Sequence, residues 1–369
     1  ILAGGEMFKD NCSFTNSFFG DFAFKPIIDR HEDHLLVLIR KWVSFKGLNE
    51  LLSDCYSFEG RKAYQPETMF RCLLIQFLYD LSDREAVERI DTDLICRWFC
   101  GFSLNDGLPH FTRLGDFKKR LSRDRFEDIF NRLVRACRNA NIISDELRVI
   151  DTTDQKAKVN ISKLKKIFKK DDNDHNYIDR NSLDKDASFG KKSSNGKRWY
   201  GYKAATLVDP DTQIVTSIKT MPANNKDNKA VRPLVESEEN NTGSNIEDLS
   251  GDKGFLGDDT RAVCAERNIN DYIIPKKNSK KHLEGKDSIG FHIARNKRSS
   301  VERVYADNKR KHGLGRCRYL GIAKTKIQNA LIFTVHNLKR ITKVIKVRIE
   351  QGLLAPPGFK GVLCPFLAN

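Results

Sequence analysis

The sequence predicts an α/β fold in which an all-α N-terminal domain precedes a mixed sheet flanked by helices. Apolar residues recur at helical spacing from Glu32 to Ala140, and after Asn141 they come in short runs bounded by turn residues, as in strands. The chain has 369 residues, which exceeds the size at which one hydrophobic core keeps growing. We therefore expect two domains, the first helical and the second built on a sheet.

The helical part is marked by apolar residues three and four positions apart. They are Phe70, Leu73, Leu74, Phe77 and Leu78 in one stretch, and Phe117, Leu121, Phe126, Ile129, Phe130 and Leu133 in another. Between them, Ser82-Asp83-Arg84-Glu85 has the sequence of a capping box and predicts the start of a short helix. A DNA-reading module and a plain packing or dimerisation domain fit this pattern equally well.

The second part predicts strands and helices in a defined order. A buried strand at 147–151 comes first, and strands at 200–209 and 213–220 form a hairpin around the turn Asp209-Pro210-Asp211-Thr212. The elements that follow are a helix (228–239), a strand (246–250), a helix (258–267), a strand (272–274) and a helix (299–312). This succession of three strands, helix, strand, helix, strand and helix is the order of an RNase H-like mixed sheet flanked by helices.

The net charge of +16 is concentrated towards the C-terminal end. Residues 1–150 hold 22 basic and 23 acidic side chains, whereas residues 291–348 hold 16 basic and 2 acidic ones. A polyanion is expected to bind where the basic residues gather, and its affinity should fall as salt rises because binding releases counterions. A solvated basic surface without a ligand is the alternative interpretation.

Three acids stand where an RNase H-like domain carries its catalytic groups. Asp151 ends the first strand, Asp252 follows the fourth, and Glu302 lies on the last helix. Arg298 and Lys309 stand four residues before and seven after Glu302, so all three share one strip of that helix. Carboxylates are the oxygen ligands that magnesium prefers. The set therefore predicts a site with two magnesium ions that cuts and joins nucleic-acid strands.

Further motifs follow one another along the chain from about residue 35 to 341. They are the run from Phe70 to Glu85, then Gly201-Tyr202-Lys203, Pro222-Ala223-Asn224, Asp252-Lys253-Gly254-Phe255, Arg318-Tyr319-Leu320-Gly321 and Asn337-Leu338-Lys339-Arg340. Together with Arg298, Glu302 and Lys309, they resemble the helical domain and the DDE domain of bacterial insertion-sequence transposases of the insertion-sequence-five type. The chain departs from that family's signature at Arg295, where a Tyr is usual.

The resemblance implies a transposase that binds the terminal inverted repeats of its insertion sequence and cleaves and joins DNA strands. Asp151, Asp252 and Glu302 would be both the catalytic residues and the ligands of magnesium, for which manganese can substitute. The basic residues expected to contact DNA are Arg298, Lys309, Lys253, Arg295, Arg316 and Arg318. The expected partners are double-stranded DNA, from the element ends and the target, and further copies of the chain in a homodimer or higher oligomer. A nuclease or resolvase that joins nothing, and an inactive copy that only binds DNA, are the alternatives.

The expected domain boundaries are 1–145 for a helical domain that recognises ends or dimerises, 146–341 for the catalytic domain and 342–369 for a C-terminal tail. Residues 160–197 are rich in Lys, Asp, Asn and Ser and are expected to form a flexible basic insertion in the catalytic domain. Asp154 is expected to be a loop acid, Asp209 is explained by its turn, and Phe255 is as readily a core residue as a DNA contact.

Composition also bears on location. Nine scattered cysteines without a Cys-x-x-Cys pair predict reduced core thiols, and no stretch approaches the roughly 18 apolar residues of a membrane span. The sequence therefore predicts a cytoplasmic protein that makes no contact with a membrane, and the resemblance to bacterial transposases implies that it is nucleoid-associated.

Overall fold

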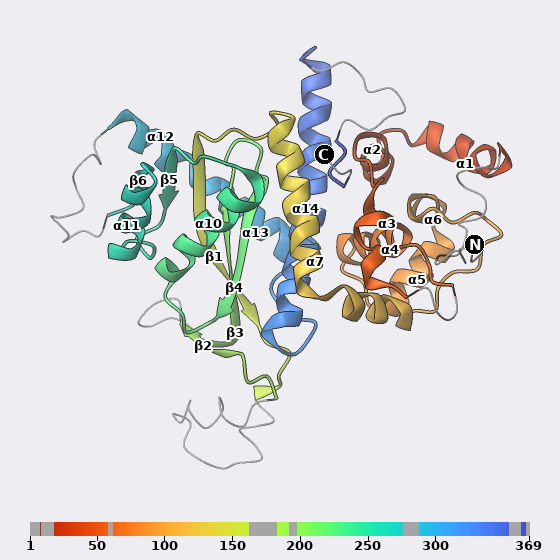
Figure 1. The fold of residues 1–369 in the computed structure, drawn as a ribbon, viewed down its shortest axis with the longest axis horizontal. Coiled ribbons are helices and arrows are strands. Elements are labelled where there is room, and N and C mark those ends of the chain that lie inside the picture. Colours follow the sequence, from red (N-terminus) through yellow and green to blue (C-terminus); the bar gives the residue numbers. More distant parts are fainter. Residues whose placement is uncertain are drawn as a thin grey trace, which may run out of the picture. The chain divides into compact units, whose positions relative to one another are not determined.

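The computed structural model describes residues 8, 18–57, 62–161, 183–191, 198–275, 288–353 and 363–366. Contacts within the chain divide it into two compact units, one formed by Ile1–Ala140 with Leu338–Asn369 and the other by Asn141–Asn337. The elements of the first unit are helices, and the second unit contains a sheet with helices (Figure 1). The predicted α/β class, with a helical N-terminal part, is therefore confirmed.

The first unit is helical throughout its described part. Its longer helices are α1 (Phe18–Arg30), α2 (Leu35–Trp42), α4 (Pro66–Leu78), α5 (Asp83–Thr92), α6 (Leu94–Cys100) and α7 (Thr112–Asn139), with short turns at α3 (Leu48–Leu51) and η1 (Ser53–Cys55). The predicted capping box is confirmed at the start of α5. There Ser82 Oγ accepts the main-chain N–H of Glu85 at 3.2 Å, and the Glu85 carboxylate accepts that of Ser82 at 2.7 Å.

A long C-terminal helix, α14 (Ile322–Glu350), runs through the boundary predicted at residue 341. The start of the predicted tail, 342–369, is therefore helical and not a separate segment. Its residues Ile341 and Ile345 are fully buried, and Lys346 donates to the Asp33 carboxylate at 2.8 Å. Burial at helical spacing explains why the helix continues past the last family motif.

The second unit is built on one sheet of six strands. They are β1 (Leu147–Lys156), β2 (Ser188–Lys191), β3 (Arg198–Val208), β4 (Val215–Pro222), β5 (Asp248–Gly251) and β6 (Asn270–Ile273). The strand order is β2-β3-β1-β5-β6, and β4 also pairs with β3. Strands β1, β5 and β6 are parallel, whereas β3 is antiparallel to β1, β2 and β4. Without β2, this is the arrangement of the predicted RNase H-like sheet.

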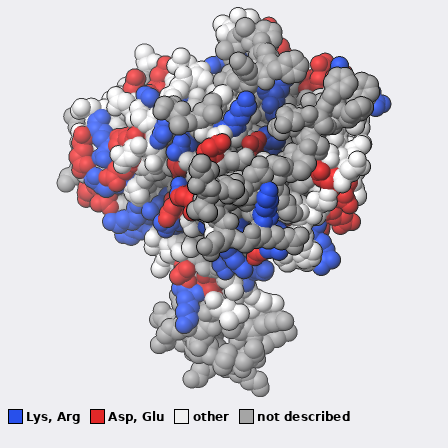
Figure 2. All heavy atoms as spheres, turned by 45° about the vertical axis from the view of Figure 1, so that its right-hand side comes forward, with Lys and Arg blue, Asp and Glu red and all other residues white. Residues whose placement is uncertain are grey.

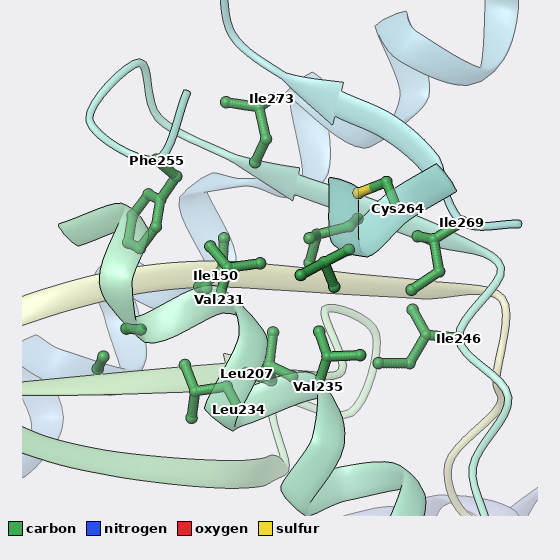
Figure 3. Packing of buried hydrophobic residues seen from close by; sticks show 14 of the residues in the cluster. Ile150, Leu207, Val231, Leu234, Val235, Ile246, Phe255, Cys264, Ile269 and Ile273 are labelled. Atoms are coloured by element: carbon green, nitrogen blue, oxygen red, sulfur yellow. The ribbon is translucent and has the colours of Figure 1, made fainter. Parts of the chain in front are cut away.

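Helices cover both faces of the sheet, and each face presents a different set of side chains. On one face, Ile150 and Leu207 are fully buried against Leu234 of α10 (Val231–Thr242) and Val263 of α11 (Asp258–Glu266). Phe255 belongs to the same cluster and is fully buried, so it is a core residue (Figure 3). Successive side chains of a strand point to opposite faces. The residues after Ile150 and before Leu207 therefore face α13 (Ser299–Lys311), which contacts β1.

The structure corrects one prediction about the segment after Asp151 and describes part of another. Asp154 lies within β1, paired with Lys203, because the partner strand β3 continues past Asp151. The expected flexible insertion contains β2, whose pairing with β3 is supported by the buried Asp184. Its main-chain carbonyl and its carboxylate accept the hydroxyls of Tyr200 and Tyr202 at 2.8 Å and 2.5 Å. The rest of that insertion lies largely outside the described residues.

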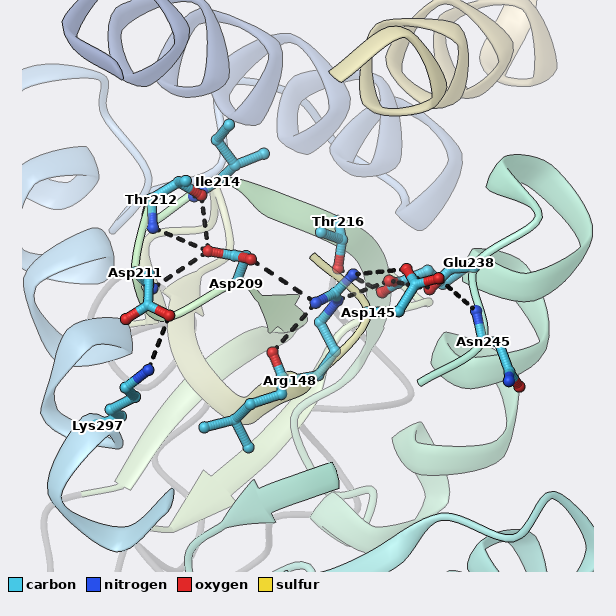
Figure 4. A network of polar contacts seen from close by, with 12 residues as sticks. Asp145, Arg148, Asp209, Asp211, Thr212, Ile214, Thr216, Glu238, Asn245 and Lys297 are labelled. Atoms are coloured by element: carbon cyan, nitrogen blue, oxygen red, sulfur yellow. Dashed lines mark hydrogen bonds and ion pairs between the residues drawn. The ribbon is translucent and has the colours of Figure 1, made fainter. Parts of the chain in front are cut away.

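A buried polar network fixes the start of β1 to α10. Arg148 and Glu238 are fully buried, and Arg148 Nε donates to Glu238 Oε1 at 2.7 Å. Thr216 donates to the other oxygen of Glu238, and Asp209 lies 3.8 Å from the Arg148 guanidinium (Figure 4). Asp209 also accepts the main-chain N–H of Thr212 at 2.8 Å, which confirms the predicted turn.

The described cysteines form no disulfide, and those at 72, 96, 100, 137, 264 and 317 are buried, as predicted for core thiols. Cys364 is exposed and Cys55 is half-buried. Among the described helices, none is both long and apolar enough to cross a membrane.

Candidate functional site

Asp151 and Asp252 come together where the parallel pairing of two neighbouring strands ends. Strands β1 and β5 are in register up to the pair Ile150 and Gly251, and each acid is the next residue along its chain. Strand β5 ends there, whereas β1 continues to Lys156 along β3. Parallel strands lie about 4.8 Å apart, so residues that follow the last pair at the same level are neighbours. Two acids that are 101 positions apart in sequence therefore stand beside each other at the carboxyl end of β5.

The close approach of β5 to β1 requires a glycine before Asp252. A Cβ on Gly251 would lie 2.6 Å from Ile150 Cγ2 and 2.9 Å from Ile273 Cδ1, which is closer than carbon atoms pack. The preceding Ser250 is also fully buried, and its hydroxyl lies 3.4 Å from the main-chain oxygen of Ala294. The small residues of β5 thus allow the tight strand packing that brings the two acids together.

Burial dominates the electrostatics of Asp151. It raises the pKa of this carboxyl to about 7, against the lowering effect of the Thr152 main-chain N–H, which donates to Asp151 Oδ1 at 2.7 Å. The negative charges of Asp252 and Asp227 raise the pKa further, and the Arg298 guanidinium lowers it. Burial thus favours the neutral form of this carboxyl. A cation bound beside it would favour the charged form and would lower its pKa again.

Glu302 lies on α13 and is paired with Arg298, the residue that caps the start of this helix. The Oε1 of Glu302 is 3.5 Å from Nη2 of Arg298, and the Glu302 side chain is 60% exposed. The positive charge of Arg298 also lowers the pKa of Asp151, so this guanidinium acts on both Glu302 and Asp151. The predicted strip of Arg298, Glu302 and Lys309 along α13 is present, but Lys309 donates to Asp154 Oδ1 at 2.7 Å.

Tyr305 joins α13 directly to the strand that carries Asp151. Its hydroxyl lies 2.6 Å from the main-chain oxygen of Asp151 and 2.8 Å from Oγ1 of Thr206, the cross-strand partner of Asp151. Burial, with the nearby Asp151, raises the pKa of Tyr305 well above its ordinary value, so the hydroxyl keeps its proton. Sequence reasoning missed this residue, because a tyrosine three positions after Glu302 has the spacing of an ordinary core residue.

Asp227 is a second residue that sequence reasoning missed. It lies in η2 (Asp227–Ala230), and its Oδ1 accepts the Lys203 ammonium at 2.8 Å and the Thr152 hydroxyl at 3.1 Å. A Cβ on Gly254 would lie 2.8 Å from Asp252 Oδ1 and 3.3 Å from Asp227 Oδ2, so both carboxylates face this glycine. An acid in the first turn of a helix is common for capping reasons alone, which is why the position gave no functional prediction.

The basic residues predicted to contact DNA differ in their surroundings. Lys253, Arg295 and Arg316 are exposed, whereas Arg298, Lys309 and Arg318 are half-buried. On the face drawn in Figure 2, the Lys and Arg side chains of the described residues are interspersed with Asp and Glu. That face therefore carries no purely basic surface among its described residues.

Asp151, Asp252 and Glu302 have the right chemistry to bind a divalent ion, but the three carboxylates are not arranged as a complete metal site. Carboxylate oxygens are the ligands that magnesium and manganese take. Asp151 and Asp252 offer two such groups side by side, and Glu302 offers a third on α13. Across the described residues no group of three or more His, Cys, Asp or Glu is arranged as a metal site, in keeping with the pairing of Glu302 to Arg298.

Two family models match the chain. A model described as "Transposase DDE domain" covers residues 144–338, more than half of the chain, and one described as "Transposase domain" covers residues 25–120. Among solved structures, a Mos1 transposase paired-end complex with the left transposon end is 11% identical over 78% of this chain and 81% of its own, with a TM-score of 0.21. A Mos1 strand transfer complex is 10% identical over 79% and 84%, with a TM-score of 0.20.

Proposed function

The chain belongs to the transposase DDE family, and from this premise we propose that Asp151, Asp252 and Glu302 are the acids that carry its chemistry. A transposase of this family cleaves DNA strands and transfers them to new sites, and the family depends on a divalent metal ion. The proposal is supported above all by the neighbouring positions of Asp151 and Asp252, each directly after the last pair of the β1–β5 register.

We further propose magnesium as the ion, with two bound and manganese as a substitute. When bound, the ions activate the attacking oxygen and neutralise the charge that develops on the leaving oxygen. Asp151 and Asp252 would hold them from the sheet. Glu302 would join them from α13, and release of its Oε1 from Arg298 would leave the Arg298 guanidinium available for a DNA phosphate. Opening one surface pair costs little, since such pairs contribute about 0–1 kcal/mol.

The remaining parts of the function follow from this chemistry as proposals. The helical unit would bind the inverted-repeat ends of the element, and a homodimer or higher oligomer would bring two ends together. Lys253, Arg295, Arg298, Lys309, Arg316 and Arg318 would contact DNA phosphates. Because the substrate is chromosomal DNA, the protein would act at the bacterial nucleoid.

The test is to incubate the full chain with Mg²⁺ and labelled DNA. This DNA carries the terminal inverted repeats of the insertion sequence in which the gene lies. Products joined to target DNA are the expected result. Nicked ends without joining would instead favour a nuclease or resolvase, and a mobility shift without cleavage would favour an inactive DNA-binding copy. Asp151→Asn serves as the control, because it removes one charged oxygen and should abolish both cleavage and joining while end binding remains.

A further inference from the structure

We propose that Tyr305 is a positioning residue for the catalytic acids, because its hydroxyl fixes α13, and with it Glu302, to the main chain of Asp151. The proposal rests on the proposed role of Asp151 and Glu302 in binding the ion. It adds a residue that neither contacts the ion nor belongs to the motif of three acids.

The hydrogen bonds of Tyr305 have one consistent arrangement. A tyrosine hydroxyl carries one hydrogen, and a carbonyl oxygen only accepts. The Tyr305 hydroxyl therefore donates to the Asp151 carbonyl at 2.6 Å, and the Thr206 hydroxyl, 2.8 Å away, donates to the tyrosine oxygen. The contact with Thr206 is buried and the contact with Asp151 is partly buried, and Thr206 is held opposite Asp151 by the β1–β3 register. One oxygen atom thus connects two strands of the sheet to the helix.

The position of Tyr305 makes this connection relevant to the acids. It stands three residues after Glu302 on α13, so the two side chains are neighbours along one face, about one turn apart. A shift of the hydroxyl is transmitted to the main chain of Glu302 through a rigid helix. On the other side, the bonded carbonyl belongs to Asp151 itself, so the same shift alters the direction of its carboxylate.

The helix has other attachments, so loss of the hydroxyl should not unfold it. Val301 and Val304 are buried on α13, and Asn308 Nδ2 lies 3.0 Å from the His336 ring of α14. Tyr305→Phe keeps the ring and removes one oxygen. We therefore expect this variant to fold and to lose only the precise placement of the acids.

The experiment measures metal binding directly, with Mn²⁺ as the probe and the full chain as the protein. Free Mn²⁺ is followed by electron paramagnetic resonance at pH 8 in the absence of DNA. Loss of a residue that orients a metal ligand typically weakens binding about 10–100-fold, and for a contact through the main chain we expect about tenfold. Single-turnover cleavage at saturating Mn²⁺ should fall by a similar factor, while the Kd for DNA ends should be unchanged.

Tyr200→Phe is the matched control. Tyr200 is also a buried tyrosine of the same unit, and its hydroxyl donates to the main-chain oxygen of Asp184 at 2.8 Å, the same kind of bond made away from the acids. It should change stability as Tyr305→Phe does and leave Mn²⁺ binding within twofold of the wild type. Equal Mn²⁺ affinities in Tyr305→Phe and Tyr200→Phe would overturn the proposal.

Thr206→Val provides a second variant if Tyr305→Phe does not fold. It removes the hydroxyl that orients Tyr305 but keeps the bond to Asp151, so a smaller weakening of Mn²⁺ binding is expected and an unchanged affinity would overturn the proposal. Asp151→Asn separates this failure from failure of the proposed function. If Mn²⁺ binding does not depend on Asp151, the proposed metal site is wrong. If it depends on Asp151 but not on Tyr305 or Thr206, only the positioning role is wrong.

Discussion

Arg148 and Glu238 form an ion pair of 2.7 Å in which both side chains are fully buried. Removal of one partner leaves an uncompensated charge inside the protein, which typically costs about 3–5 kcal/mol. We therefore expect Glu238→Ala to lower the urea midpoint of the second unit strongly, measured by tryptophan fluorescence or by hydrogen exchange of β1. Arg148 stands three residues before Asp151, so the site should be lost with the fold.

The exposed pair of Arg232 and Glu266 is the control for this prediction. Their Nη1 and Oε2 lie 2.8 Å apart, but the side chains are 41% and 50% exposed. Exposed pairs contribute about 0–1 kcal/mol, so Glu266→Ala should shift the midpoint little. Similar shifts for Glu238→Ala and Glu266→Ala would contradict a structural role of the buried network.

Glu302→Gln tests the third acid of the site. Loss of a residue that orients a ligand costs about 10–100-fold, so loss of a ligand charge should lower the rate of end cleavage by more than about a hundredfold. Binding of DNA ends should remain, because Glu302 is an exposed side chain and the substitution keeps its shape. Gel-based cleavage and mobility-shift assays on the same samples give both values. Undiminished cleavage would remove Glu302 from the mechanism.

The raised pKa of Asp151 predicts a pH dependence of metal binding. Burial raises the pKa to about 7, so the folded protein holds a proton on this carboxyl below that pH and a divalent ion must displace it. We expect Mn²⁺ to bind roughly tenfold more weakly at pH 6 than at pH 8, since proton competition grows with each unit below the pKa. Isotherms at pH 6, 7 and 8 measure this, and a flat profile would contradict it.

The same shift has a consequence for the stability of the metal-free protein. Between the ordinary pKa of an aspartate and about 7, the folded chain holds a proton that the unfolded chain has lost, so stability falls as pH rises through this window. Asp151→Asn carries no charge at any pH. It should therefore melt at a higher temperature than the wild type at pH 8, and the difference should shrink at pH 5.

Local patterns in the sequence were sufficient to predict most of the order of elements along the second unit and the elements that carry the acids. The Asp209 turn, the β3–β4 hairpin around it and the capping box at Ser82 each depend on residues close together in the chain. Such features can be recognised from spacing alone. The placement of Asp151 on the first strand and of Glu302 on the helix at 299–311 followed from that order.

The features that were missed depend on contacts between distant residues. Strand β2 is only four residues long, and its place on the sheet depends on pairing with β3, on the packing of Phe189 against Tyr200 and on the bonds from Tyr200 and Tyr202 to Asp184. Similarly, the pair of Lys309 with Asp154 joins a helix to a strand that was expected to have ended. Spacing within a chain carries no information on such pairs, so the local environment of each predicted site residue had to come from the structure.

Salt dependence should distinguish the exposed basic residues near the acids from those held in ion pairs. Each phosphate contact contributes about 0.9 to the slope of log Kd against log salt concentration. Lys253→Ala and Arg295→Ala should each lower the slope by about that amount. Lys309→Ala should have a smaller effect, because Asp154 already pairs with its ammonium. Arg232→Ala, in an exposed pair on α10, is the control and should leave the slope unchanged.

Gly254→Ala tests whether metal binding needs the present orientation of the Asp252 and Asp227 carboxylates, which both lie next to Gly254. The added Cβ would lie 2.8 Å from Asp252 Oδ1, closer than real contacts allow, and 3.3 Å from Asp227 Oδ2. Asp252 would have to turn away, since its Oδ1 also accepts the Gly254 N–H at 2.7 Å. We expect about tenfold weaker Mn²⁺ binding, the size of a lost orienting contact, with a nearly unchanged melting temperature. Gly107→Ala, which meets nothing within 4 Å, is the matched control, and equal Mn²⁺ affinities in both variants would show that Asp252 does not need its present orientation.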